Sequence, residues 1–399
     1  MFSALFRLSS GLVCATVFLA ACDESPPEIV LEPVKSGDIY AITVGEESIA
    51  SLPLNGPTVN PEEAELGWLL FWDPVLSGNL EVACATCHLP EFGYSDGLRT
   101  SIGVGGVGRG DQRSGGTEGH VPRNTPTLIN AVFNGIDETG AYDLATAPMF
   151  WDNRAAGFAD QAAGPVRSAI EMRGTVLSED EIWVEVSARV NAIAEYRARF
   201  ETVYGAEANQ DRITQAIAAF ESTLVANNSR FDQWMRGDAD ALTEEELNGM
   251  ESFFGEGCAD CHNGPMFSDY ELRVLAAPDG PRVTEPDVGD GAYGFRTATL
   301  RQLEFTGPYF HGGHVATIED AVEFYDNFDD DEDDDDDDDE DENELNPAVD
   351  RSLLDELLQE VDEDDIEEIS AFLRTLSDPD YFKDEPTTVP SGLPVGGFE

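Results

Sequence analysis

The sequence predicts a mainly α-helical protein made of two domains of similar design. Apolar residues recur at helical spacing in several segments, whereas strand-like alternation is sparse. A pentapeptide of the form Cys-x-x-Cys-His occurs twice, at 84–88 and 258–262, and each copy follows a predicted helix. The length of 399 residues is sufficient for two domains that each bury a core.

The first 21 residues have the layout of a secretory signal peptide, with one basic residue before an apolar run. The run ends in Leu-Ala-Ala-Cys, which is typical of bacterial lipoprotein signals, so cleavage before Cys22 and lipidation of its thiol are predicted. Residues 22–58, rich in Pro, Gly and acidic residues, are predicted to form a lipidated tether. No later segment has about 18 uncharged apolar residues in a row. We therefore expect a periplasmic protein, attached to a bacterial membrane only through its N-terminal lipid.

The N-terminal domain is predicted to span 59–205 and the C-terminal domain 206–380. The domains are built from amphipathic segments that predict helices over 60–74, 180–205, 211–237, 243–257 and 362–377. The first and fourth of these helices lead into the two pentapeptides. An acidic insertion (329–344) and the segment 381–399 are predicted to be disordered.

The charge balance is strongly acidic, with 81 acidic and 22 basic residues and a net charge of −59. Nucleic acid is excluded as a partner, because binding to phosphates needs a basic face. An acidic surface instead attracts basic proteins. The sequence leaves a homodimer open.

Cysteine usage narrows the chemistry of the pentapeptides. Once Cys14 is removed with the signal and Cys22 is lipidated, the remaining thiols form two pairs, each followed by histidine: Cys84, Cys87 and His88, then Cys258, Cys261 and His262. A four-cysteine zinc site usually has its pairs about 15–20 residues apart, whereas 171 positions (258 minus 87) separate these two. A redox dithiol explains neither the histidine nor the second copy.

Covalent haem explains every residue of the pattern, because two thiols bond to the haem vinyl groups and the adjacent histidine binds iron. We therefore predict two cytochrome c-like domains, each with one covalently attached c-type haem. Haem 1 denotes the group at 84–88 and haem 2 the group at 258–262.

Several segments, in this order, resemble the bacterial di-haem cytochrome c peroxidase and MauG-like family. The resemblance covers roughly residues 60–378. It rests on LGWLLFWDPVLSGN, CATCH, PRNTPTLINAVFN, MFWDNRAAGFADQAAGPVRSAIEM, NSRFDQWMRGD, CADCHNGPMFSD and TGPYFHGGHVATIEDAVEFY.

The resemblance implies that haem 1 is the site where H2O2 binds, with Gln161 and Glu171 on its far side. A carboxyl suits this position, because heterolytic O–O cleavage needs a proton moved from the near to the far oxygen. Trp151 is implied as the electron relay between the haems.

The resemblance also implies a calcium ion between the domains. Asn124, Thr306 and Pro308 align with the positions that hold this ion, mostly through oxygen atoms, which Ca²⁺ prefers.

Haem 2 departs from the peroxidase pattern. Those enzymes place a methionine on its far side, but this chain has no methionine after Met266. Tyr325 occupies the matching position, as in MauG-like proteins, and a phenolate would favour Fe(III) and lower the potential. His311 and His314 are alternative ligands, and Tyr325 could instead be a core aromatic residue.

Two further residues bear on the comparison within the family. MauG-like proteins carry a tryptophan two residues before the second haem motif, where this chain has Glu256. His120 lies in the Gly-rich loop that in peroxidases often supplies a histidine to cap haem 1. It is predicted either to cap haem 1 or to face solvent.

The expected function is a di-haem peroxidase that reduces H2O2 with electrons from a small redox protein, such as a basic cytochrome c or a cupredoxin. The alternatives are a MauG-like oxidase that modifies a partner protein and a di-haem electron carrier without catalytic activity.

Overall fold

The computed structural model describes residues 31–116, 120–137, 139–328 and 345–398. The predicted signal peptide, Cys22 and the acidic insertion lie outside these residues. Among the helices described, none is both long and apolar enough to cross a membrane.

The mainly α class is confirmed. The helices before residue 225 are α1 (Pro61–Trp72), α2 (Gly157–Arg167), α3 (Glu179–Ala192), α4 (Ala194–Tyr204) and α5 (Gln210–Glu221). Those after it are α6 (Arg230–Met235), α7 (Glu244–Gly255), α8 (Cys258–Cys261), α9 (Leu303–Thr306), α10 (Ile318–Glu323) and α11 (Ile366–Arg374).

Strands are short. The strands β1 (Val34–Ser36), β2 (Ile39–Val44) and β3 (Glu47–Ala50) form one antiparallel sheet. The remaining strands pair as two-residue ladders: β4 (Gly106–Val107) with β5 (Ser114–Gly115), β6 (Pro148–Met149) with β7 (Ala155–Ala156), and β8 (Leu272–Arg273) with β9 (Phe295–Arg296).

Local sequence explains where the two helices that lead to the pentapeptides begin. The Asn60 side chain accepts a hydrogen bond from the backbone N–H of Glu62, with Pro61 at the first helical position of α1. The helix α7 starts with a capping box between Thr243 and Glu246.

Each of these helices packs closely against a later helix through a glycine. A Cβ atom on Gly67 of α1 would lie 1.8 Å from the carbonyl oxygen of Ala216 in α5. A Cβ atom on Gly249 of α7 would lie 1.8 Å from the carbonyl oxygen of Glu368 in α11. Only glycine permits either approach, so the two halves of the described chain share one packing arrangement.

The boundary predicted between residues 205 and 206 is wrong. One hydrophobic core includes Ile213, Ile217 and Phe220 of α5 together with residues of α1. Another includes Phe231 of α6 together with residues of α7 and α11. The helix α5 belongs to the first half because its apolar face packs on α1. We call the parts built around these cores the first half and the second half.

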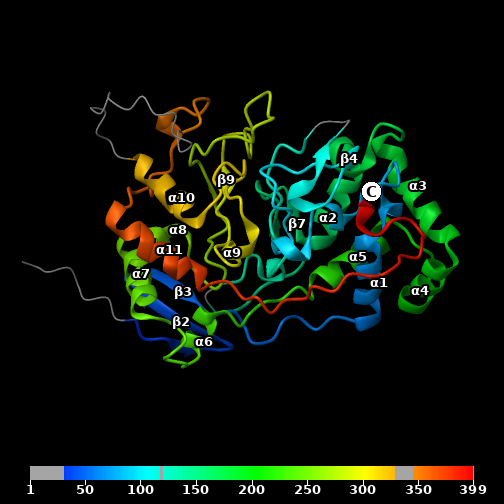
Figure 1. Cartoon of the computed structure of the whole chain (residues 1–399). Helices are drawn as coiled ribbons and strands as arrows, with labels where there is room; N and C mark the ends of the chain where they lie inside the picture. Colours follow the sequence, from blue (N-terminus) through cyan, green and yellow to red (C-terminus); the bar gives the residue numbers. More distant parts are fainter. Residues whose placement is uncertain (1–30, 117–119, 138, 329–344, 399) are drawn as a thin grey trace, which may run out of the picture. The chain divides into compact units, whose positions relative to one another are not determined.

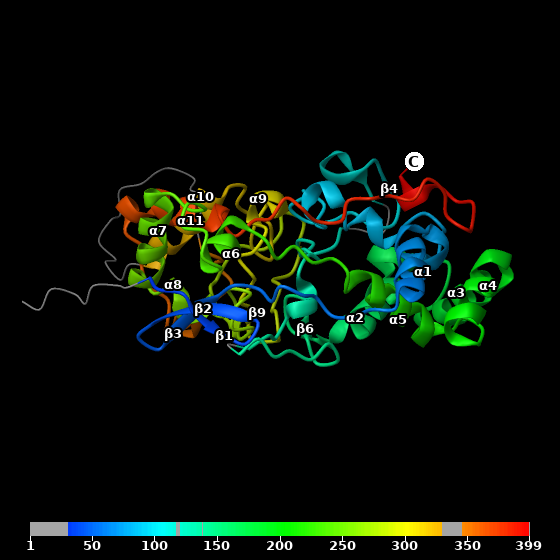
Figure 2. The same cartoon turned by 90° about the horizontal axis from the view of Figure 1, so that it is seen from below.

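Part of the predicted tether is also structured. Ile42 of β2 and Ile49 of β3 are buried in the second core. Figures 1 and 2 show this blue sheet beside the helices of the second half. Composition alone missed the sheet because its few apolar residues gain their partners only from distant parts of the chain.

The segment 381–398, predicted to be disordered, packs on the first half. The hydroxyl of Tyr94 donates to the carbonyl of Phe382 (3.0 Å), and Val389 is buried in the first core. Ser391 donates to the buried Asp73 carboxylate (2.6 Å). In both views this red segment runs from α11 back to α1. Its anchors are isolated in sequence, so composition gave no sign of them.

Candidate functional site

A chamber in the first half is lined by Cys84, Cys87 and His88. The short 3-10 helix at 84–86 brings the three side chains onto one turn, because the N–H groups of Cys87 and His88 both donate to the carbonyl of Cys84 (3.1 and 3.0 Å). We call this cavity the first chamber.

The His88 imidazole is prepared to bind a metal. Its Nδ1 lies 2.8 Å from the carbonyl oxygen of Tyr94. A carbonyl only accepts, so Nδ1 carries the hydrogen and Nε2 keeps its lone pair. Burial lowers the pKa of His88 to about 4, which keeps the ring neutral at physiological pH.

Two of the predicted catalytic residues line the same chamber. Gln161 comes from α2, and Glu171 from the π-helical turn Ala169–Arg173 that follows it. Burial raises the pKa of Glu171, although a hydrogen bond with Ser168 and the charge of Arg154 partly oppose the shift. The carboxyl therefore keeps its proton to a higher pH than an ordinary glutamate does.

A second chamber is lined by Cys258, Cys261 and His262, where α7 ends and α8 begins. His262 repeats the geometry of His88, with Nδ1 3.0 Å from the carbonyl oxygen of Phe267. Burial lowers the pKa of His262, so this ring also stays neutral with Nε2 free of hydrogen.

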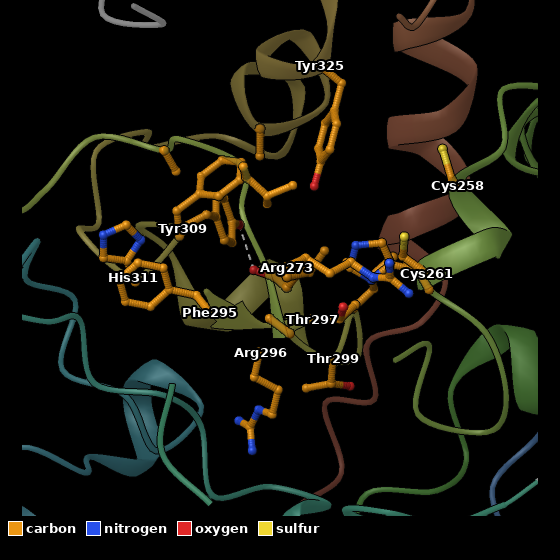
Figure 3. A pocket seen from close by; sticks show the side chains of 18 of the residues that line it. Cys258, Cys261, Arg273, Phe295, Arg296, Thr297, Thr299, Tyr309, His311 and Tyr325 are labelled. Atoms are coloured by element: carbon orange, nitrogen blue, oxygen red, sulfur yellow. Dashed lines mark hydrogen bonds between the residues drawn. The ribbon is translucent and has the colours of Figure 1, made fainter. Parts of the chain in front are cut away.

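Tyr325 points into the second chamber from the 3-10 helix after α10 (Figure 3). Its pKa is raised by burial and by the two nearby thiols, Cys258 and Cys261. The phenol is therefore neutral here, and a cation such as iron would be needed to stabilise a phenolate.

The alternative ligands are differently placed. His311 lines the second chamber, but its ring stacks on Phe295 (centroids 3.7 Å apart) and its Nε2 lies 3.3 Å from Asp279. His314 is absent from the lining of the chamber, although it is buried and neither ring nitrogen has a hydrogen-bond partner in the described chain. Burial lowers the pKa of His314 to about 3. Of the three candidates, Tyr325 alone lines the chamber without a polar side chain of the described residues as its partner.

Trp151 lies in the wall between the chambers, since it lines both. Its indole N–H donates to the carbonyl of Asn124 (2.8 Å), and its own carbonyl accepts from the backbone N–H of Arg296 (2.7 Å). Both partners also line the two chambers. The ring is thus held in position from each side.

The residues implied to hold calcium meet at the second chamber. Asn124, Thr306 and Pro308 all line it. The Asn124 amide donates to the carbonyl of Leu98 (3.0 Å), which leaves its side-chain oxygen as an acceptor. No group of three or more His, Cys, Asp or Glu in the described residues is arranged for a metal. The donor set here is neutral oxygen, which fits calcium only weakly.

His120 and Glu256 lie in different surroundings. His120 contacts Arg282, with 2.7 Å between Nε2 and Nη1, and is absent from the lining of the first chamber. Glu256 lines the second chamber, and its pKa is raised by burial and by Asp365 and Asp362.

Sequence reasoning missed Glu221, which lines the first chamber from α5. The signal was present as one acidic residue on the apolar face of that helix, four positions after Ile217. A buried acid on an apolar face requires a reason.

Comparisons with known proteins agree with this arrangement. The family described as di-haem cytochrome c peroxidase matches residues 61–240. A cytochrome c551 peroxidase of Nitrosomonas europaea is 40% identical over 273 residues, 66% of this chain and 72% of the relative. The cytochrome c551 peroxidase of Pseudomonas aeruginosa is 34% identical over 69% of this chain and 74% of the relative. The methylamine utilization protein MauG of Methylorubrum extorquens is 33% identical, over 67% and 69%.

Solved structures show the same fold. A MauG-like protein associated with microbial copper homeostasis superposes with a TM-score of 0.64 and 25% identity, over 90% of this chain and 96% of that one. The diheme peroxidase BthA of Burkholderia thailandensis has a TM-score of 0.62 and 19% identity, over 90% and 98%. With the relatives at 34–40% identity, these findings show that the chain belongs to the di-haem cytochrome c peroxidase family.

Proposed function

We propose that this protein is a di-haem peroxidase that reduces H2O2 to water, with two electrons and two protons consumed for each peroxide. The observation that carries the proposal is the first chamber, in which Glu171 and Gln161 share a cavity with His88. An electron carrier has no need of a buried acid there.

The residues present fit two covalent haems. Each chamber contains two thiols and a neutral histidine whose Nδ1–H bonds a carbonyl, at Tyr94 for the first and at Phe267 for the second. Cys84, Cys87 and His88 would hold haem 1, and Cys258, Cys261 and His262 would hold haem 2. Haem would supply an iron that binds peroxide in the first chamber and an iron that passes electrons in the second.

Glu171 would move the proton. Its carboxyl would accept a proton from one oxygen of peroxide and return it to the other oxygen, which leaves as water. Burial suits the group to both steps, because its raised pKa is closer to neutrality. The Gln161 amide would orient peroxide through a hydrogen bond, since an amide offers both a donor and an acceptor.

Trp151 would lie on the electron route from haem 2 to haem 1, because it lines both chambers. The donor would be a small redox protein with a basic face, attracted by the acidic chain. We propose a periplasmic location, with lipid on Cys22 as the only membrane attachment. Calcium at Asn124, Thr306 and Pro308 remains part of the proposal.

Tyr325 is proposed as the far-side ligand of haem 2. A Tyr325→Phe variant should raise the haem 2 reduction potential and change its ferric spectrum, because a phenolate favours Fe(III). Tyr309, which also lines the second chamber but donates to the carbonyl of Leu303 (2.7 Å), supplies the control variant Tyr309→Phe. An unchanged spectrum in Tyr325→Phe would remove this assignment.

Tyr325 also favours a second function, a MauG-like oxidase acting on a partner protein. Glu256 argues against it, because MauG-like proteins have a tryptophan there for electron transfer from the partner.

Peroxide turnover by the purified protein, with a reduced basic cytochrome c as donor, separates these functions. Steady oxidation of the cytochrome supports the peroxidase. A long-lived oxidised state after peroxide, without cytochrome turnover, supports the oxidase. No reaction with peroxide supports a pure electron carrier and overturns the proposal.

A further inference from the structure

Glu221 is a buried carboxyl that the proposed peroxide chemistry does not use. It lies in the last turn of α5 and is 3% exposed. Its Oε2 is buried with no hydrogen-bond partner in the described chain, and the residue lines the first chamber together with Cys84 and His88. A buried polar atom left unpaired destabilises the fold, so its retention in a chamber wall points to a role.

The helix holds this carboxyl in place. Ile217 and Phe220 of α5 are buried in the first core, and Gly67 brings α1 against the preceding turn. The carboxyl is therefore fixed in the wall of the first chamber, and the chamber is its route for exchanging a proton with solvent.

The charged groups on the elements packed against α5 either have other partners or, like Glu62 of α1, are exposed. On α1, Glu63 accepts from the hydroxyl of Tyr204, and Glu65 pairs with Arg199. On α2, Arg167 donates to the side chain of Gln210, and Asp160 is exposed.

The charged residues that line the first chamber form a separate network around Arg123, which pairs with Asp152 and Asp287. Arg154 pairs with Asp152 as well. The other charged residues of the lining are Glu171, Glu285 and Arg296. Burial alone raises the pKa of the Glu221 carboxyl, to about 8.

Burial and isolation make this carboxyl responsive to a change of charge in the chamber. Reduction of a haem iron adds one electron, which raises the pKa of a nearby buried acid, and oxidation lowers it. By linkage, a proton bound on reduction makes the potential fall as pH rises.

We propose that Glu221 is the residue that takes up one proton when the haem 1 iron is reduced and releases it when the iron is oxidised. The electron comes from the donor protein through haem 2, and the proton comes from solvent. This inference rests on the proposed attachment of haem at Cys84 and Cys87. Proton uptake by Glu221 would thus offset the negative charge that the electron adds to the first chamber. Glu221 itself would not contact peroxide.

The test is a spectroelectrochemical titration of haem 1 in the full-length holoprotein between pH 6 and 9. The reduction potential of wild-type haem 1 should fall as the pH rises around pH 8. The equilibrium constant for reduction should fall by up to tenfold per pH unit, which corresponds to 59 mV for one electron. In Glu221→Gln, which keeps the shape but cannot titrate, this fall should disappear.

One control variant isolates the effect, and a second buried acid is distinguished by the pH range of its titration. Glu256→Gln removes a carboxyl from the second chamber and should leave the haem 1 slope unchanged. Asp96 is a second buried acid near Cys87, and its pKa, raised by burial to about 6, places its titration in a lower pH range.

An equal slope in wild type and Glu221→Gln would overturn the inference. If the variant folds poorly, the reduced-minus-oxidised infrared difference spectrum of the wild type decides, because proton uptake by a carboxylate must add a carboxylic acid C=O band on reduction. Absence of that band also overturns it. A haem count below two would instead refute the proposed function, so the two failures are distinguishable.

Discussion

The two halves of this protein use the same frame for different chemistry. In each, a helix crosses a later helix through a glycine, at Gly67 and at Gly249, and then leads to a Cys-x-x-Cys-His turn. In each, the histidine Nδ1–H bonds a backbone carbonyl. The halves differ in the residues added around this frame, because Gln161, Glu171 and Glu221 line the first chamber alone and Tyr325 lines the second alone.

On the proposed haem attachment, the frame would fix the position of a haem, whereas the other chamber walls would decide its reactivity. A carboxyl with a raised pKa suits proton transfer, and a phenol suits a stable sixth ligand. Variants that exchange or remove these wall residues should therefore change reactivity without disturbing haem attachment.

The largest expected effect is on peroxide turnover. Glu171→Gln should lower the rate of peroxide reduction roughly 10²–10⁴-fold, because the proton-transferring group is lost. Glu256→Gln, which removes the half-buried acid of the other chamber, should change the rate little. Stopped-flow kinetics with H2O2 measure both. Similar losses in the two variants would mean that the chambers do not divide the chemistry as described.

The next effect concerns the segment 381–398, whose buried anchors lie in the first half. Truncation after Pro379 exposes the core around Val389 and removes one of the hydrogen-bond partners of the buried Asp73. The loss should be about 2–3 kcal/mol, the value of one fully buried aliphatic side chain. Hydrogen exchange should increase in α1 and α5 and stay unchanged in α7 and α11. Uniform change would contradict a local role.

A smaller effect is expected at the two glycine crossings. Gly67→Ala and Gly249→Ala should each lower the free energy of unfolding by about 1–3 kcal/mol, because the added methyl forces the helices apart. Gly255→Ala on α7 is the matched control, since its Cβ meets nothing within 4 Å, and it should change stability by about 0.5 kcal/mol or less. Denaturant titrations measure all three. If only one of the two glycine substitutions lowered the free energy of unfolding, the two halves would not share the same packing arrangement.

The sequence predicted the parts of the protein that depend on local patterns. Helical periodicity, the Asn60 and Thr243 caps and the two pentapeptides are all short-range signals, and the helices begin where these signals place them. The residues Gln161, Glu171 and Trp151 were found through family resemblance, and the structure brings them to the first chamber.

The parts that the sequence did not predict depend on long-range contacts. Nothing near Ile42 or Val389 indicates that each is buried in the core of the half farther away along the chain. The helix α5 was assigned to the wrong half for the same reason. Glu221 was missed because an acid on a helix is ordinarily exposed, and only the packing of α5 on α1 turns it inward.

The central claim is that two covalent haems occupy equivalent frames, with the iron in the first chamber open and the iron in the second bound by Tyr325. A haem count combined with the electron paramagnetic resonance spectrum of the oxidised protein tests it most directly. The account predicts two haems per chain, one high-spin and one low-spin. Two low-spin signals, or a single haem, would contradict it.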